Sequence, residues 1–180
     1  NGGISGSFST GKKLSHLVSA DGKKSNGYIR NTDFNMSGIY YANRLNLNGK
    51  GHVDTQLGFS GKAFGANSFY TPKYPNQFEQ TRTLFGSVSA LLGKKYHLSP
   101  VIWYRRHQDR FELFRNDPPA WYTSHNHHLT HVSGASLNSW VAWKAGKTSA
   151  GAEFRNETIF SNVLGEVMDE QKNVPGEDAL

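Results

Sequence analysis

The segment best equipped for chemistry runs from Trp103 to Arg115 and reads WYRRHQDRFELFR. If it is extended, alternate side chains share a face. One face then carries Arg106, Gln108, Arg110 and Glu112, and the other carries Arg105, His107 and Asp109. Charge on both faces cannot lie in hydrocarbon, so this half of the strand is expected outside any membrane. Either Arg106, Gln108 and Arg110 line a polar lumen and meet a ligand, or the charges form a cross-strand ladder, which is the commoner use of such residues.

A second group of reactive side chains comprises His125, His127, His128 and His131. On a strand, His125, His127 and His131 share a face, which makes a metal site geometrically possible. No acidic ligand lies beside them in the sequence. A solvated loop followed by the start of a strand therefore explains these residues better than a metal site, and neither metal nor cofactor is predicted.

The third candidate is the aromatic and proline-bearing run from Phe64 to Glu79. Long loops of this composition usually have a function, because ordering them is costly. It is interpreted as a ligand-contact surface, with a lid packed into a barrel mouth as the alternative. Trp121 and Tyr122, in the next long loop, are assigned to the same binding surface.

Catalysis has no recognisable motif in this chain. The sequence contains neither a Gly-x-Ser-x-Gly nucleophile elbow nor a glycine-rich phosphate loop that leads into a helix. There is no Cys, so a thiolate nucleophile, a thiolate metal site and a disulfide framework are excluded. The chain is predicted not to be an enzyme.

The elements that hold these residues are predicted from a two-residue hydrophobic period. In His52–Phe64, one parity carries apolar residues and the other carries His52, Asp54, Gln56, Ser60 and Lys62. Thr148–Phe160 repeats the pattern, with Ala152 and Phe154 alternating with Glu153 and Arg155. Such strands have one apolar and one unusually charged face, which favours a membrane barrel with lipid outside and water inside.

Four short turns rich in Gly and Lys alternate with long polar or aromatic loops, as in outer-membrane barrels. The turns are 11–13, 48–51, 93–95 and 145–147, and the loops are 21–33, 65–80, 116–126 and the tail from 164. The predicted strands are 3–9, 14–20, 33–47, 51–64, 80–92, 95–116, 126–144 and 147–163. Several exceed the ~9–11 residues that cross a bilayer, so they are expected to project beyond its outer surface. Trp140 and Trp143, near a short turn, fit an aromatic girdle.

Composition limits the partners. The 180 residues suffice for one domain, and 36% hydrophobic residues with only short apolar runs exclude a helical membrane protein. The net charge of +6 raises nucleic acid as a partner, but the cations are dispersed over turns and strand ends. Nucleic-acid binding is therefore not predicted.

Several of these segments resemble the barrel of TonB-dependent outer-membrane receptors of the cobalamin-receptor type. The resemblance covers nearly the whole chain, from about Ile4 to Leu180. It rests on the order and spacing of the segments 25–28, 31–34, 64–77, 104–111 and 174–178, the last similar to the start of a further outer loop.

The resemblance implies an all-β, antiparallel transmembrane barrel segment of about eight strands within a 22-stranded barrel. The chain would be about a third of that barrel, without its plug domain. The implied function is active import of a scarce nutrient, a cobalamin or related corrinoid, across the bacterial outer membrane. The implied partners are outer-membrane lipid, the nutrient and TonB, the last through the plug; a surface lipoprotein is left open. The segment 21–27, which matches an acidic calcium loop of the family, is short and basic here.

By the resemblance, Asn67, Phe69, Tyr70 and Tyr74 match the ligand-facing loop of the family in type and place. With Arg106, Arg110, Trp121 and Tyr122 they form the predicted substrate-binding set. Two alternatives remain. One is a complete eight-stranded outer-membrane barrel with a structural or adhesive role, and the other is a soluble carbohydrate-binding β-sandwich.

Overall fold

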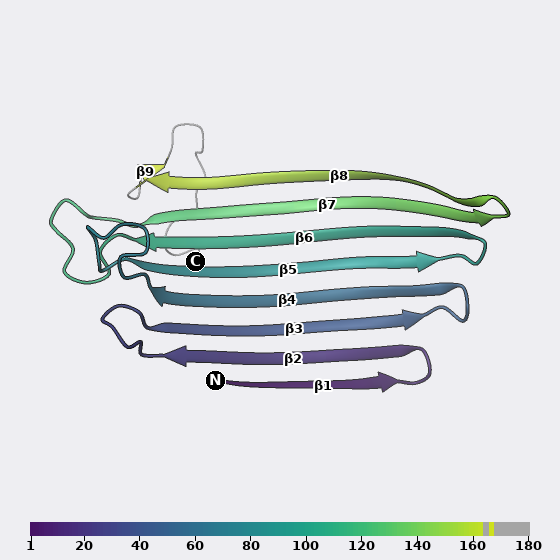
Figure 1. Ribbon diagram of the computed structural model, residues 1–180, viewed down its shortest axis with the longest axis horizontal. Helices are drawn as coiled ribbons and strands as arrows, with labels where there is room; N and C mark the ends of the chain where they lie inside the picture. The colour runs from purple at the N-terminus through teal and green to yellow at the C-terminus, as the bar shows by residue number, and fades with distance from the viewer. Residues whose placement is uncertain (164–165, 168–180) are drawn as a thin grey trace.

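A computed structural model of the chain describes residues 1–163 and 166–167. The predicted outer-loop segment 174–178 and most of the tail from 164 lie outside these residues. The described chain is a single antiparallel meander, in which each strand pairs with the next in order from β1 to β9 (Figure 1). The strands are β1 Gly2–Thr10, β2 Leu14–Ser25, β3 Phe34–Asn46, β4 Gly51–Gly65, β5 Phe78–Leu92, β6 Tyr96–Glu112, β7 Asn126–Trp143, β8 Gly146–Val163 and the two-residue β9 Glu166–Val167.

All eight predicted strands are present, and most ends agree within a few residues. The largest difference is in β2, because residues 21–25 were predicted to be loop and instead continue the strand. Their backbone pairs with the start of β3, from Asp21 opposite Gly38 to Ser25 opposite Phe34. A partner strand with free ladder positions thus outweighs the local turn signal of Asp-Gly-Lys-Lys. The end of β6 also moves inward, from 116 to Glu112.

The predicted division between short turns and long loops is confirmed. The turns that follow β1, β3, β5 and β7 lie at one end of the sheet, which we call the turn end (Figure 1). Loops 26–33, 66–77 and 113–125 lie at the opposite end, the loop end. In the β3–β4 turn, Asn48 and Gly49 have φ of 49° and 75°, and Lys50 N donates to Leu47 O. Two successive positive φ angles make a type I′ turn, which the Asn-Gly pair predicts.

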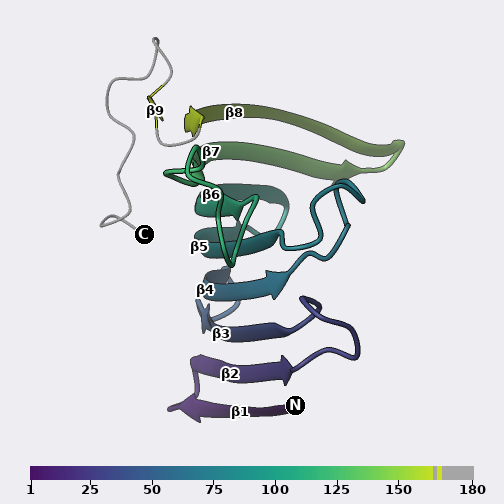
Figure 2. The ribbon, with the colours of Figure 1, turned by 90° about the vertical axis from the view of Figure 1, so that its left-hand side faces the viewer.

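The sheet is one layer thick and open. Seen end-on, the strands stack in a single layer from β1 at one edge to β8 near the other (Figure 2). Among the described residues β1 and β8 do not pair, so a closed eight-stranded barrel is not formed. No described second sheet covers either face, as a sandwich would require. The described residues also contain no helix long and apolar enough to cross a membrane.

Candidate functional site

The strand register sorts the side chains onto two faces. The apolar face contains Val53, Leu57 and Phe59 of β4, and the polar face contains their neighbours Asp54 and Gln56. Large side chains of the apolar face are exposed, with Leu57 50% and Phe154 69% exposed. The other exposed large hydrophobic residues of this face include Ile4, Phe8, Val18, Ile39, Phe59, Leu84, Val88, Ile102 and Leu137. A continuous apolar surface of this extent marks contact with a lipid or another protein.

The loop-end border of the apolar band is level in register over the first five strands, since Ile4, Ala20, Ile39, Phe59 and Leu84 are successive register partners. The register partner of Leu84 on β6 is Arg106, so the band ends at Tyr104 on β6. On β7 it ends at Ala135, level with Phe154 of β8. The border therefore lies closer to the turn end in the second half of the sheet.

The width of the band fits a bilayer. On β5 it runs over nine residues, Leu84–Leu92, which is about 27 Å along a strand at ~3.4 Å per residue. Aromatic residues border it at the turn end, where Tyr96 and Trp143 are 70% and 59% exposed. Trp140, by contrast, lies on the polar face, stacked on His97 at 4.8 Å. The prediction that Trp140 belongs to the girdle is wrong, because residues three apart on a strand face opposite ways.

The polar face carries charges that neutralise one another. Arg44 of β3 donates two hydrogen bonds of 2.7 Å to the Asp54 carboxylate on β4. On β8, Arg155 pairs with Glu157. Aromatic rings also lie over glycines of this face, because a Cβ on Gly58 would be 2.3 Å from the Phe85 ring and one on Gly134 would be 2.3 Å from the Trp103 ring. These contacts pack the polar face without a second layer of protein.

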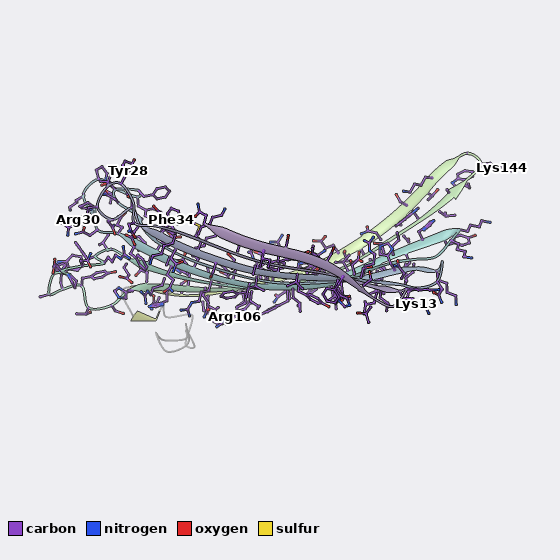
Figure 3. All side chains as sticks on the ribbon, turned by 90° about the horizontal axis from the view of Figure 1, so that it is seen from below. Lys13, Tyr28, Arg30, Phe34, Arg106 and Lys144 are labelled. Atoms are coloured by element: carbon purple, nitrogen blue, oxygen red, sulfur yellow. The ribbon has the colours of Figure 1, made fainter. Side chains whose placement is uncertain are left out.

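The charged half of β6 does not have the orientation that lining a lumen would require. The strand register places Arg106 and Arg110 on the apolar-face side, beyond the loop-end border of the band. Arg106 is labelled in Figure 3. The prediction that they line the polar lumen is therefore wrong, since that face takes Arg105 and Asp109 instead. Polar contacts do join this half of β6 to its neighbours, since His107 Nδ1 lies 2.7 Å from the Thr83 hydroxyl of β5 and the Tyr104 hydroxyl lies 2.7 Å from His131 Nδ1 of β7. Arg110 pairs with Glu112 of its own strand at 2.5 Å, and its guanidinium lies over the Phe78 ring at 5.9 Å.

Aromatic side chains from two loops meet at the loop end. Tyr74 of loop 66–77 contacts the Phe114 ring edge-on at 5.3 Å, and Phe114 in turn contacts Trp121 at 5.7 Å and Tyr122 at 5.3 Å. Phe114 thus joins three of the predicted site residues, although it was not itself predicted. Tyr122 is buried, and its hydroxyl accepts a hydrogen bond from Leu113 N at 2.8 Å, so its role here is structural.

A separate aromatic group lies over the polar face. Phe69 contacts Tyr70 at 4.9 Å, and Tyr70 contacts Phe111 of β6 at 5.3 Å, both edge-on. Phe69 is 74% exposed, and Trp121 of the first group is 58% exposed. The structure therefore divides the predicted binding residues into two groups, of which the first exposes Trp121 and the second exposes Phe69 and Tyr70.

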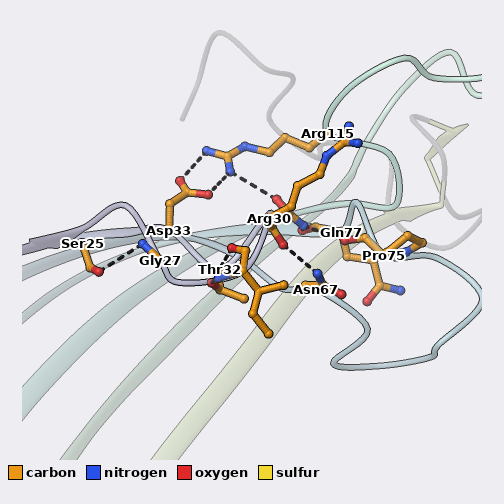
Figure 4. A network of polar contacts seen from close by, with 11 residues as sticks. Ser25, Gly27, Arg30, Thr32, Asp33, Asn67, Pro75, Gln77 and Arg115 are labelled. Atoms are coloured by element: carbon orange, nitrogen blue, oxygen red, sulfur yellow. Dashed lines mark hydrogen bonds and ion pairs between the residues drawn. The ribbon is translucent and has the colours of Figure 1, made fainter.

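Three loops are tied together by Asn31, Asp33 and Arg115, which we call the loop brace (Figure 4). Arg115 donates to both carboxylate oxygens of Asp33 at 2.5 and 2.9 Å and to Asn31 Oδ1 at 3.2 Å. Asn31 Nδ2 donates to the carbonyls of Pro75 and Gln77 at 3.0 and 2.6 Å. Loop 26–33, loop 66–77 and the segment after β6 are thereby fixed to one another.

The loop brace sets the pKa of Asp33, and the Asn67 amide also holds two neighbouring segments together. Hydrogen bonds from Arg115 lower the pKa of Asp33 below its ordinary 3.8; partial burial opposes this shift, and the charge of Arg115 adds to it. Asn67 Nδ2 donates to Arg30 O at 2.6 Å, and Asn67 Oδ1 accepts from the Ser68 hydroxyl at 2.8 Å. The predicted ligand contact Asn67 therefore uses its amide to hold loop 26–33.

Acidic groups collect beneath Tyr70. The Tyr70 hydroxyl donates to Glu79 Oε2, and burial followed by this contact raises the pKa of Tyr70 to about 12. Burial, followed by the charge of Glu79, raises the pKa of Asp109. This part of the polar face lies beyond the apolar band and faces the exposed ring of Phe69, so it offers hydrogen-bonding groups next to an aromatic surface.

The histidines are distributed rather than gathered. His131 Nδ1 is 2.7 Å from the Tyr104 hydroxyl on one face, and His128 Nδ1 is 2.8 Å from the Ser161 hydroxyl on the other. Within the described ranges, no set of three His, Cys, Asp or Glu residues is placed to hold a metal ion.

Comparison of the chain with protein-family models, with curated proteins and with solved structures found no match.

Proposed function

We propose that the chain is part of the β-barrel of an outer-membrane receptor that imports a scarce nutrient. In this proposal the apolar face meets lipid, the polar face lines an aqueous interior and the loop end faces outward. The exposed apolar band on one face of the sheet, opposite a charged face, is the observation that carries it. The turn-end aromatic residues and the alternation of short turns with long loops give further support.

The open edges of the sheet fit a segment of a larger barrel. An unpaired edge strand invites pairing with another strand, and closing the barrel removes that hazard. We propose that further strands complete the barrel beside β1 and β8, and that a plug domain fills it and connects it to TonB, as in the 22-stranded transporters. The smaller complete barrel requires β1, with 9 residues, to pair with β8, with 18 residues. This mismatch disfavours it.

The nutrient is proposed from the resemblance to be a cobalamin or related corrinoid. The exposed rings of Phe69 and Trp121, with Tyr74 between the loops, offer flat apolar contacts of the kind a large planar ligand uses. Binding of cyanocobalamin by equilibrium dialysis tests this part of the proposal. We expect W121A to weaken binding and Trp143→Ala, at the opposite end of the sheet, to leave it unchanged; equal binding by both variants would argue against the ligand surface.

Sidedness tests the membrane proposal. The chain has no Cys, so single variants Lys50→Cys and Tyr74→Cys each report one position. In intact cells, a membrane-impermeant maleimide should label the Tyr74 variant and should reach the Lys50 variant only after the outer membrane is opened. Labelling of the Lys50 variant in intact cells would overturn the orientation.

A further inference from the structure

Carboxylates avoid the apolar face of the described sheet. On β1–β8 the polar face carries Asp21, Asp54, Glu79, Asp109, Glu153 and Glu157. The apolar face carries only Glu112, which is 6% exposed and paired with Arg110. The surface of the apolar face is therefore devoid of accessible negative charge over these eight strands.

Basic side chains, in contrast, lie on the apolar face at the loop-end border of the band. Arg106 of β6 is flanked in register by Leu84 on one side and His131 on the other. In the described part of the chain its guanidinium makes no hydrogen bond or ion pair, and Figure 3 shows it projecting from this side of the sheet. The Tyr104 hydroxyl, 2.7 Å from His131 Nδ1, fixes the imidazole beside it.

An apolar groove of about 360 Å³ begins next to these cations. It exists because Gly86 places no side chain between its register partners Leu57 and Tyr104. The groove is lined by Leu57, Leu84, Phe85, Val88, Ile102 and Tyr104. Leu84 lines it and is also the register partner of Arg106, so the groove and the guanidinium are adjacent.

An apolar groove that ends at a guanidinium is complementary to a lipid with an anionic head group. Arginine binds phosphate through two parallel hydrogen bonds, and such charge-assisted bonds are strongest away from bulk water. The absence of accessible carboxylates removes the competitor that would otherwise neutralise Arg106. The groove would accept one acyl chain, which its apolar lining would hold by van der Waals contact.

We propose that this site binds a phosphate-bearing lipid, with one acyl chain in the groove over Gly86 and the phosphate on Arg106 beside His131. The site rests on the proposed function for its membrane setting, and it lies at the leaflet nearer the loop end. A phosphomonoester fits better than a zwitterionic head group, because no carboxylate of this face is available to pair with a choline or ethanolamine cation.

The test uses the full chain refolded in zwitterionic detergent and titrated with phosphatidic acid, with bound lipid counted by native mass spectrometry. R106Q should lower the affinity for phosphatidic acid about tenfold, the effect of losing a charge-assisted hydrogen bond. R105Q removes the same charge from the adjacent residue on the polar face and should leave the affinity unchanged. G86L fills the groove; it should weaken binding of a lipid with long chains but keep binding of a dibutyryl analogue.

Equal affinities of R106Q and R105Q, or equal binding of phosphatidic acid and phosphatidylcholine by the parent chain, would overturn the site. Far-ultraviolet circular dichroism checks that each variant keeps its β-structure. Failure of the site is distinguishable from failure of the proposed function, because the accessibility of Leu57→Cys to lipid-borne quenchers reports the membrane face without involving Arg106.

Discussion

At the loop end of the sheet, side chains pack against and bond to one another, whereas in the body of the sheet large apolar side chains are exposed. At the loop end, Gln77 and Phe78 are buried, the Arg115 guanidinium lies 4.4 Å from the Phe78 ring, and the brace joins three loops. In the body, large side chains such as Leu57 and Phe154 are exposed on a face that nothing described covers. The loop end thus resembles a small water-soluble core. Under the proposed function, the body would instead obtain its apolar environment from lipid, so the two regions would be built for two solvents.

The largest expected effect comes from placing a charge on the apolar face in the body of the sheet. Leu57→Arg should lower the free energy of unfolding in lipid vesicles by about 1–3 kcal/mol, because position 57 lies between the border of the band and the midplane, where Arg costs about 2–4 kcal/mol. Gln56→Arg, one residue away on the polar face, should change it little. Urea titration of the two variants in vesicles measures the difference. Equal effects would mean that the two faces share one environment.

The loop end should respond to a different change, the loss of the brace. Arg115→Ala leaves Asp33 and Asn31 without their shared donor and should lower local stability by about 1–2 kcal/mol. Hydrogen exchange should become faster in residues 26–33 and 66–77 and stay unchanged in β4. Arg30→Ala, which removes an exposed guanidinium from the same loop, serves as the control. Unchanged exchange in both loops would show that the brace does not hold them.

The packing of the polar face provides a weaker test. Gly58→Ala forces the Phe85 ring to move and should destabilise the chain by about 1 kcal/mol, as overpacking does. Gly6→Ala in β1 adds the same methyl group where no atom lies within 4 Å. Unfolding midpoints of the two variants should therefore differ, and identical midpoints would indicate that the ring does not rest on Gly58.

Acid should loosen the loop end through the protonation of Asp33. A carboxyl group whose pKa falls on folding stabilises the fold above its unfolded pKa, and this contribution is lost as the pH falls through the folded value. For Asp33, whose ordinary pKa is 3.8, loop protection should be constant above about pH 4 and decline below it. Hydrogen exchange corrected for intrinsic rates measures this decline, and it should be absent in Asp33→Asn.

The smallest effect is spectroscopic and concerns Tyr70. With its pKa raised to about 12, Tyr70 should keep its proton while ordinary tyrosines ionise near 10. The contact with Glu79 should therefore persist through pH 10 and be lost as the pH rises toward 12. Ultraviolet titration of the parent chain and of Tyr70→Phe should differ only in the late step. A difference near pH 10 would contradict the contact between Tyr70 and Glu79.

The body of the sheet could be predicted from the sequence because its signals are local. Alternation in 52–64 and 148–160 gives the faces of β4 and β8, and the Asn48-Gly49 pair gives the turn. Arg106 and Ile102 have the same parity in the sequence, which indicates that their side chains share the apolar-face side of the strand. The prediction that Arg106 lines the lumen relied instead on its charge alone.

The loop end could not be predicted in the same way because its contacts are long-range. Asp33 and Arg115 are 82 residues apart in the chain, and nothing near either residue indicates the other. The topology offered one signal, since the start of β3 and the end of β6 both lie at the loop end and carry opposite charges. Phe114 was overlooked for a related reason, because it follows a strand whose predicted end was placed at 116 instead of Glu112.

The central claim is that the apolar face meets lipid, and adjacent single-cysteine variants of β4 test it most directly. Leu57→Cys and Gln56→Cys, each carrying a bimane fluorophore, would be placed in vesicles with and without brominated acyl chains. We predict strong quenching by bromine at position 57 and weak quenching at position 56, with iodide in the water giving the reverse order. Quenching of position 57 by iodide, with no response to bromine, would contradict the account.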